Sequence, residues 1–192
     1  MVPQVDGGMA KRLGTAMLRG LLLVAVLAPA ALAGEPTRTE AVGLRLAVPA
    51  AWTRVPAPSD VRAAQWRLPR ATGDAEDGEA ILFFFGAGKG GGAAENLERW
   101  YGQFTPADGR PARDAAVITQ RTVHALRVTS LDLAGAYRAT PPGAPKPGFR
   151  LLAAVIEGPG GPWFLKVFGP QATVAAAKDG FEAVLASLEA HP

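Results

Sequence analysis

The sequence predicts an α+β fold in which a mainly antiparallel β-sheet is sandwiched by two amphipathic helices. Three observations lead to this prediction. Several segments alternate apolar and polar residues, as half-buried strands do, and two longer runs are apolar without alternation, as strands covered on both faces are. Two further segments repeat apolar residues at helical spacing. With 192 residues, 48% of them hydrophobic and 19% charged, the chain has the composition of a folded domain.

The first 33 residues have the pattern of a secretory signal peptide. Basic residues precede an apolar run from Leu21 to Ala28, and the segment ends in the small-residue tripeptide Ala31–Leu32–Ala33. The run is too short for a membrane span, which needs about 20 apolar residues. We therefore expect residues 1–33 to be removed on export. The mature protein is then periplasmic or secreted and has no membrane span.

The net charge limits the classes of partner to expect, and the cysteine content limits how the fold can be stabilised. The leader carries three basic residues and one acidic residue, so its removal lowers the net charge from +3 to +1. A nearly neutral protein gives no electrostatic reason to expect nucleic acid or an anionic membrane as partner. The chain has no cysteine, so its stability must come from the core rather than from disulfides. We expect a monomer.

The first half of the mature chain predicts four strands. Residues 34–40 are polar and are expected to form a flexible lead-in to a single domain over residues 41–190. The acidic segment 74–79 is expected to be a solvated loop. The expected strands are, in order, Val42–Val48, Trp52–Val55, Ala64–Leu68 and Ala80–Phe85, the last buried on both faces.

A glycine-rich segment, Gly86–Gly92, separates these strands from the first expected helix. The apolar stripe of that helix consists of Leu97, Trp100, Tyr101 and Phe104, at i, i+3, i+4 and i+7. Beyond this helix we expect a hairpin over Val117–Leu133 that turns at His124–Ala125, and then a surface loop over Pro141–Gly148. Paired strands follow at Leu151–Ile156 and Trp163–Phe168. Gly169–Pro170 is expected to break the second of these strands, and a closing helix is expected over Ala172–Leu188.

Two motifs in this layout resemble the PsbP-like fold superfamily. The opening pattern Gly-x-x-φ-x-φ-Pro-x-x-Trp, with φ apolar, is approximated by Gly43–Trp52, and the closing pattern Phe-x-x-φ-φ-x-Ser-φ by Phe181–Leu188. The resemblance implies a small exported or lumenal protein that acts as a binding or assembly factor without catalysis. The stretch from Phe85 to Phe104 is also similar to uncharacterised exported bacterial proteins. No functional residue of the superfamily maps onto this chain.

The glycine loop is one candidate binding site, because it follows a strand and precedes a helix whose N-terminus could receive an anion. The P-loop pattern fails, since no Ser or Thr follows Lys89. The dinucleotide fingerprint has correctly spaced glycines but no recognisable βαβ unit. A flexible connection is the more typical role of such a loop. The residues that would contact a ligand here are Gly88, Lys89, Gly90 and Gly91.

The sequence gives little support for a catalytic site or a metal site. Ser130, His124 and Asp132 could be imagined as a triad, but no nucleophile elbow surrounds the serine. Zinc-binding clusters of Cys and His are missing, and the acidic segment lacks calcium-loop spacing. We therefore assign no catalytic residue, no metal and no cofactor. Of the four tryptophans, Trp163 lies beside a Gly/Pro hairpin tip and is the one expected to be partly exposed and available to a ligand.

These observations predict an exported, non-catalytic binding or assembly module. Its partner is an unknown envelope protein or small ligand. Two alternatives remain open: an envelope hydrolase whose carboxylates are brought together only by the fold, and a binder of phosphate or another anion at Gly86–Gly92. A deep cleft lined by carboxylates with raised pKa values would favour the hydrolase.

Overall fold

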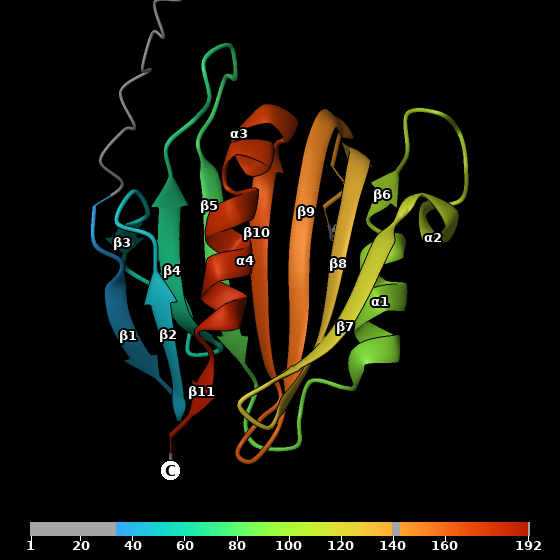
Figure 1. Cartoon of the computed structure of the whole chain (residues 1–192). Helices are drawn as coiled ribbons and strands as arrows, with labels where there is room; N and C mark the ends of the chain where they lie inside the picture. The colour runs from blue at the N-terminus through green and yellow to red at the C-terminus, as the bar shows by residue number, and fades with distance from the viewer. Residues whose placement is uncertain (1–33, 140–142, 192) are drawn as a thin grey trace, which may run out of the picture. The chain divides into compact units, whose positions relative to one another are not determined.

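The computed structural model describes residues 34–139 and 143–191. Most strands in this part of the chain form one antiparallel β-sheet (Figure 1). The predicted signal peptide lies outside the described residues. In sheet order the strands are β3 (Thr53–Val55), β4 (Arg62–Leu68), β5 (Gly78–Phe84), β10 (Trp163–Pro170), β9 (Lys146–Glu157), β8 (Leu126–Tyr137) and β6 (Phe104–Thr105), and β7 (Val117–Val123) also pairs with β8. Most neighbours are consecutive in sequence, which favours antiparallel pairing. The β5–β10 pair joins the two halves of the chain.

One face of this sheet is covered by a small sheet and two C-terminal helices. The small sheet consists of β1 (Thr37–Ala41), β2 (Leu44–Val48) and β11 (Glu189–Ala190), and the helices are α3 (Gln171–Ala176) and α4 (Lys178–Ala186). Figure 1 shows α4, in red, in front of the large sheet. Its Phe181 and Leu185 share one apolar core with Leu46 of β2 and with Trp163 and Leu165 of β10.

The opposite face carries a second core, beneath α1 (Ala93–Tyr101). Trp100 of α1 packs with Leu131 of β8, with Ala153 and Val155 of β9, and with Phe164 of β10. The helix lies behind β7 and β8 in Figure 1. A single turn, α2 (Ala112–Ala115), precedes β7. The central strands are therefore covered on both faces, and the predicted α+β sandwich is confirmed.

The predicted hairpin between residues 117 and 133 is also confirmed. Strands β7 and β8 pair from Val123–Leu126 to Val117–Asp132. His124 and Ala125 have positive φ angles of 43° and 68°. Two such residues in succession are typical of a type I′ turn, whose twist matches that of the flanking strands.

At the N-terminal end, two predictions were wrong. Thr37–Ala41 was placed mainly in a flexible lead-in, yet it forms β1 and pairs along its whole length with β2. Val42 was expected to begin a strand, but it lies in the β1–β2 turn with φ 48°. The side chains of β1 are largely exposed, so this edge strand lacks the apolar alternation that would have indicated it.

The expected closing helix is two helices. Ala177 separates α3 from α4 and adopts φ −85° and ψ −4°, near the edge of the helical region. The amide of Phe181 still donates a hydrogen bond to the carbonyl of Ala177, at 2.9 Å. The chain thus changes direction here while its apolar side chains stay on the core.

Three further boundaries differ from those predicted. Phe104 belongs to β6 and pairs with Tyr137, because α1 ends at Gly102. The expected surface loop is shorter, since Pro147 and Gly148 lie in β9; residues 140–142 are outside the described part. The Gly169–Pro170 pair does not break the strand but continues β10 opposite β9.

Candidate functional site

The glycine loop between β5 and α1 is a defined turn rather than a free connection. Gly90 has φ +96°, and a Cβ at this position would lie 2.6 Å from the ring of Phe164, so only glycine fits. The Gly88 amide donates a 2.8 Å hydrogen bond to the carbonyl of Gly161 in the β9–β10 hairpin. The buried Asn96 of α1 donates from its side-chain amide to the carbonyls of Gly90 and Gly92, at 3.0 and 2.9 Å.

The donors that an anion would need at this loop are partly occupied. The Gly92 amide donates to the Glu95 carboxylate at 3.2 Å, which is the half of a capping box that an N-cap glycine allows. Glu95 thus places a negative charge where a bound phosphate would lie. Lys89 is exposed, and its amide donates to the carbonyl of Gly86.

An open hollow of about 300 Å³ borders the loop. Gly88 and Gly91 line it together with the β9–β10 hairpin, and its charged side chain is Glu157. This carboxylate receives a 3.0 Å hydrogen bond from Arg127. A hollow lined by a carboxylate does not favour phosphate compounds, so the geometry gives the predicted loop site little electrostatic support.

The expectation for Trp163 was wrong. Its side chain is 0% exposed, and its indole N–H donates a 2.9 Å hydrogen bond to the carbonyl of Val42. The Gly/Pro hairpin tip folds over the ring, since a Cβ at Gly161 would lie 2.7 Å from it. Trp163 is a core residue and has no surface to offer a ligand.

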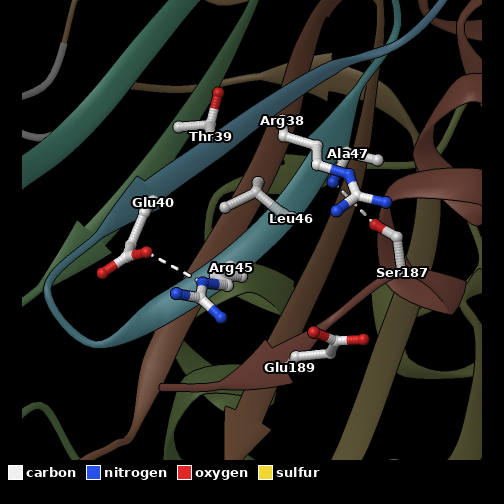
Figure 2. Close-up of a pocket in the computed structure, with 8 residues that line it drawn as sticks. All are labelled: Arg38, Thr39, Glu40, Arg45, Leu46, Ala47, Ser187 and Glu189. Atoms are coloured by element: carbon white, nitrogen blue, oxygen red, sulfur yellow. Dashed lines mark hydrogen bonds and ion pairs between the residues drawn. The ribbon is translucent and has the colours of Figure 1, made fainter. Parts of the chain in front are cut away.

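A hollow of about 420 Å³ lies on the outer face of the small sheet (Figure 2). The alternation of β1 and β2 turns Arg38 and Glu40 of β1, and Arg45 and Ala47 of β2, to this face. Ala47 is short and leaves space beside the longer side chains. Glu40 accepts a 2.8 Å hydrogen bond from Arg45, and Figure 2 shows the Arg38 guanidinium pointing toward Ser187.

The groups in this hollow are not arranged for catalysis. Ser187 accepts a hydrogen bond from the Ala47 amide and donates one to the carbonyl of Val184, both 2.8 Å, so its hydroxyl fastens the end of α4 to β2. The hydrogen bond from Arg45 lowers the pKa of Glu40, which keeps this carboxyl group ionised. A general acid needs the opposite shift.

Ser130 and Asp132 line one small hollow, but no hydrogen bond joins either of them to the other or to His124 within the described residues. Nδ1 of His124 lies 3.1 Å from the carbonyl of Leu188. Asp132 accepts two hydrogen bonds from Arg150, at 2.7 and 2.6 Å, and one from Lys178 at 2.9 Å. Burial raises the pKa of Asp132, but these hydrogen bonds outweigh it and the net shift is downward. Asp132 therefore acts as an anchor between strands and α4.

The acidic segment 74–79 is likewise engaged in structural contacts. Asp74 accepts hydrogen bonds from the amide and hydroxyl of Thr173, at 2.8 and 2.6 Å, and so holds the start of α3. Glu76 pairs with Lys146 at 2.9 Å. Among residues 34–139 and 143–191, no three His, Cys, Asp or Glu side chains are grouped so that they could hold a metal ion.

Sequence reasoning missed a smaller hollow between α1 and the sheet. It has a volume of about 130 Å³ and is lined by Phe83, Phe85, Asn96, Arg99, Trp100, Gln103, Phe164 and Lys166. Lys166 projects from β10 on the α1 face, between Phe164 and Phe168 in sequence. The run Trp163–Phe168 was interpreted as a strand apolar on both faces, and its single lysine was not weighed.

The electrostatics of this hollow depend on Lys166, which is partly buried. Burial lowers the pKa of its ammonium group to about 8. The Glu79 carboxylate opposes this shift, whereas the positive charges of Arg62 and Arg99 add to it. A shift of this size, in a hollow lined by polar and aromatic side chains, is typical of functional sites.

Comparisons with known proteins identify the fold. No family model and no curated protein matches the chain. The solution structure of cyanobacterial PsbP from Synechocystis sp. PCC 6803 is similar over 88% of this chain and 99% of that one, with a TM-score of 0.50 and 14% identity. The crystal structure of PA94 from Pseudomonas aeruginosa, a protein of unknown function described as a putative regulator, covers 83% and 99%, with a TM-score of 0.48 and 15% identity.

The likeness to cyanobacterial PsbP shows that this chain has a PsbP-like fold, as the motifs Gly43–Trp52 and Phe181–Leu188 predicted. At 14% identity it shows the fold alone. A shared fold does not carry a shared function, which must be argued from the site.

Proposed function

We propose that this protein is an exported, non-catalytic binding or assembly module. The observation that supports it is a sheet whose two faces, within the described residues, are both covered by cores of apolar side chains. The carboxyl groups with a shifted pKa are Glu40, Asp108 and Asp132, and in each the pKa is lowered. Such groups serve as ion-pair partners rather than as proton donors at neutral pH.

Export is supported by the leader pattern of residues 1–33. Within the described part of the chain, no helix combines the length and hydropathy that crossing a membrane requires. The test is expression of the full chain in a bacterium, followed by cell fractionation and N-terminal sequencing. We expect a periplasmic or secreted product that begins at Gly34; a full-length cytoplasmic product would contradict export.

Two measurements on the same preparation distinguish a binding module from an enzyme. Affinity capture from the source envelope should retain a specific partner or ligand, and assays with ester, peptide and glycoside substrates should give no turnover. The hydrolase alternative would draw on the hollow that contains Glu40 and Glu189. Turnover that disappears in the double variant Glu40→Gln/Glu189→Gln would overturn the non-catalytic proposal.

A further inference from the structure

The hollow beneath α1 contains polar groups that lack partners among the described residues. The Lys166 ammonium forms no hydrogen bond or ion pair with any of them, although it is partly buried. The buried Oε1 atom of Gln103 also has no hydrogen-bond partner there. Buried polar groups in proteins are nearly always satisfied, so the Gln103 oxygen calls for a hydrogen-bond donor. The Lys166 ammonium, which is only partly buried, is available to a partner of opposite charge.

The walls of the hollow are aromatic. Phe83 and Phe85 stack with centroids 6.2 Å apart and an interplanar angle of 1°, and Phe85 meets the edge of Phe164 at 5.6 Å. Phe85 is 41% exposed, which is high for a phenylalanine next to a core. A face of this kind is open to a further ring, because aromatic pairs prefer stacked or edge-on contacts.

The size of the hollow limits what can enter it. At about 130 Å³ it is close to the roughly 150 Å³ cavity that admits a benzene molecule. It is well below the roughly 300–1,000 Å³ of pockets for drug-sized ligands. One six-membered ring therefore fits, whereas a nucleotide does not.

The charge around the hollow selects an anion. Lys166 and Arg99 line it, and Arg62 lies over the ring of Phe83 at 5.5 Å. The opposing charge is Glu79, which accepts a 3.2 Å hydrogen bond from Gln65 and lies 3.9 Å from Arg62. Three positive charges against one negative charge leave a positive excess, which a ligand carboxylate would reduce.

We infer that this hollow binds a small aromatic carboxylate, with its ring against Phe83, Phe85 and Phe164 and its carboxylate at Lys166 and Arg99. The inference rests on the proposed binding function and names the ligand class for it. It gives a function to a lysine placed in an aromatic hollow, where burial without a partner costs stability.

Isothermal titration calorimetry of the purified protein tests this inference with three probes: benzoate, its neutral isostere benzamide, and acetate, which has the charge but no ring. At pH 7 we expect saturable benzoate binding at or below about 1 mM. Benzamide and acetate should each bind at least about tenfold more weakly, which corresponds to about 1.4 kcal/mol. Equal affinities for benzoate and benzamide, or no heat with benzoate, would overturn the inference.

Matched lysine variants locate the site. Lys166→Met should weaken benzoate binding at least about tenfold, whereas Lys89→Met, which removes the same charge from the exposed glycine loop, should leave it unchanged. Raising the pH from 7 to 9 should weaken binding to the wild type, because Lys166 loses its proton as the pH passes about 8. A pH-independent affinity, or an effect of Lys89→Met alone, would contradict the assignment.

The outcomes also separate this inference from the function on which it rests. If benzoate fails to bind while affinity capture still retains a specific partner, the ligand class is wrong and the binding module stands. If substrate turnover is found, the non-catalytic function fails whatever benzoate does.

Discussion

The indole N–H of Trp163 donates a 2.9 Å hydrogen bond to the backbone carbonyl of Val42. The bond links the central strand β10 to the β1–β2 turn, where Val42 has a positive φ of 48°. Because Trp163 is 0% exposed, its indole N–H depends on this bond for a partner. The hydrogen bond therefore holds the β1–β2 turn of the small sheet against strand β10 of the large sheet.

Trp163→Phe should destabilise the protein by about 2–4 kcal/mol, because it removes buried volume and the hydrogen bond to the Val42 carbonyl. Urea unfolding measures the loss. Trp52→Phe is the control: Trp52 is 8% exposed and its indole N–H donates to no described residue. A loss no greater than that of the control would contradict the role of the hydrogen bond.

Asn96→Leu should loosen the glycine loop and cost about 1–3 kcal/mol, since the carbonyl of Gly90 loses its amide donor inside the protein. Amide hydrogen exchange over residues 86–92 should become faster. Glu95→Gln keeps an acceptor for the Gly92 amide and should leave exchange nearly unchanged. Unaltered exchange in Asn96→Leu would show that the loop does not depend on this side chain.

Asp132→Asn should destabilise the protein by about 1–3 kcal/mol at pH 7, because Arg150 and Lys178 lose their charged partner. The lowered pKa of Asp132 means that its stabilisation is present above its ordinary pKa of about 3.8 and is lost as the pH falls below it. The difference in stability between variant and wild type should be constant from pH 7 to about pH 5 and should begin to shrink as the pH falls below about 3.8.

The matched control for Asp132 is Asp108→Asn. Asp108 is exposed and its pKa is also lowered by Arg110, but solvent screens this pair. The control should be as stable as the wild type at every pH, within the error of the unfolding measurement. An equal loss of stability at both positions would mean that the partial burial of Asp132 does not strengthen its ion pairs.

Lys166→Met should stabilise the unliganded protein at pH 7 by up to about 3 kcal/mol, since a pKa lowered from 10.5 to about 8 reports the cost of burying the ammonium group. The unfolded chain holds this proton up to about pH 10.5 while the native protein releases it near pH 8. Wild-type stability therefore rises with pH in that window, and the advantage of the variant shrinks. Thermal unfolding at pH 7 and pH 10, with Lys89→Met as control, measures the difference.

Much of the fold could be predicted because its strands carry strong patterns. Trp163–Phe168 and Leu151–Ile156 are apolar on both faces and were placed correctly at the centre of the sheet. Strand β1 could not be predicted, since an exposed edge strand needs no apolar alternation. The break at Ala177 has no glycine or proline signal and arises from packing on the sheet.

The candidate site was largely hidden from sequence reasoning. The glycine loop attracted attention, but its glycines serve close packing against Phe164 and hydrogen bonds to Asn96. The hollow beneath α1 joins Arg99 to Lys166, which lie 67 positions apart. A lysine within an otherwise apolar strand was the one available signal, because a charge facing a covered side of a sheet breaks the pattern that builds the core.

The titration of Lys166 tests the account most directly, because the ligand site and the stability predictions both depend on an unpaired, partly buried ammonium group. NMR of ¹³C-labelled lysine side chains, assigned with Lys166→Met, gives its pKa with and without benzoate. We predict a value near 8 that rises when benzoate is added. A value near 10.5 that benzoate does not change would contradict the account.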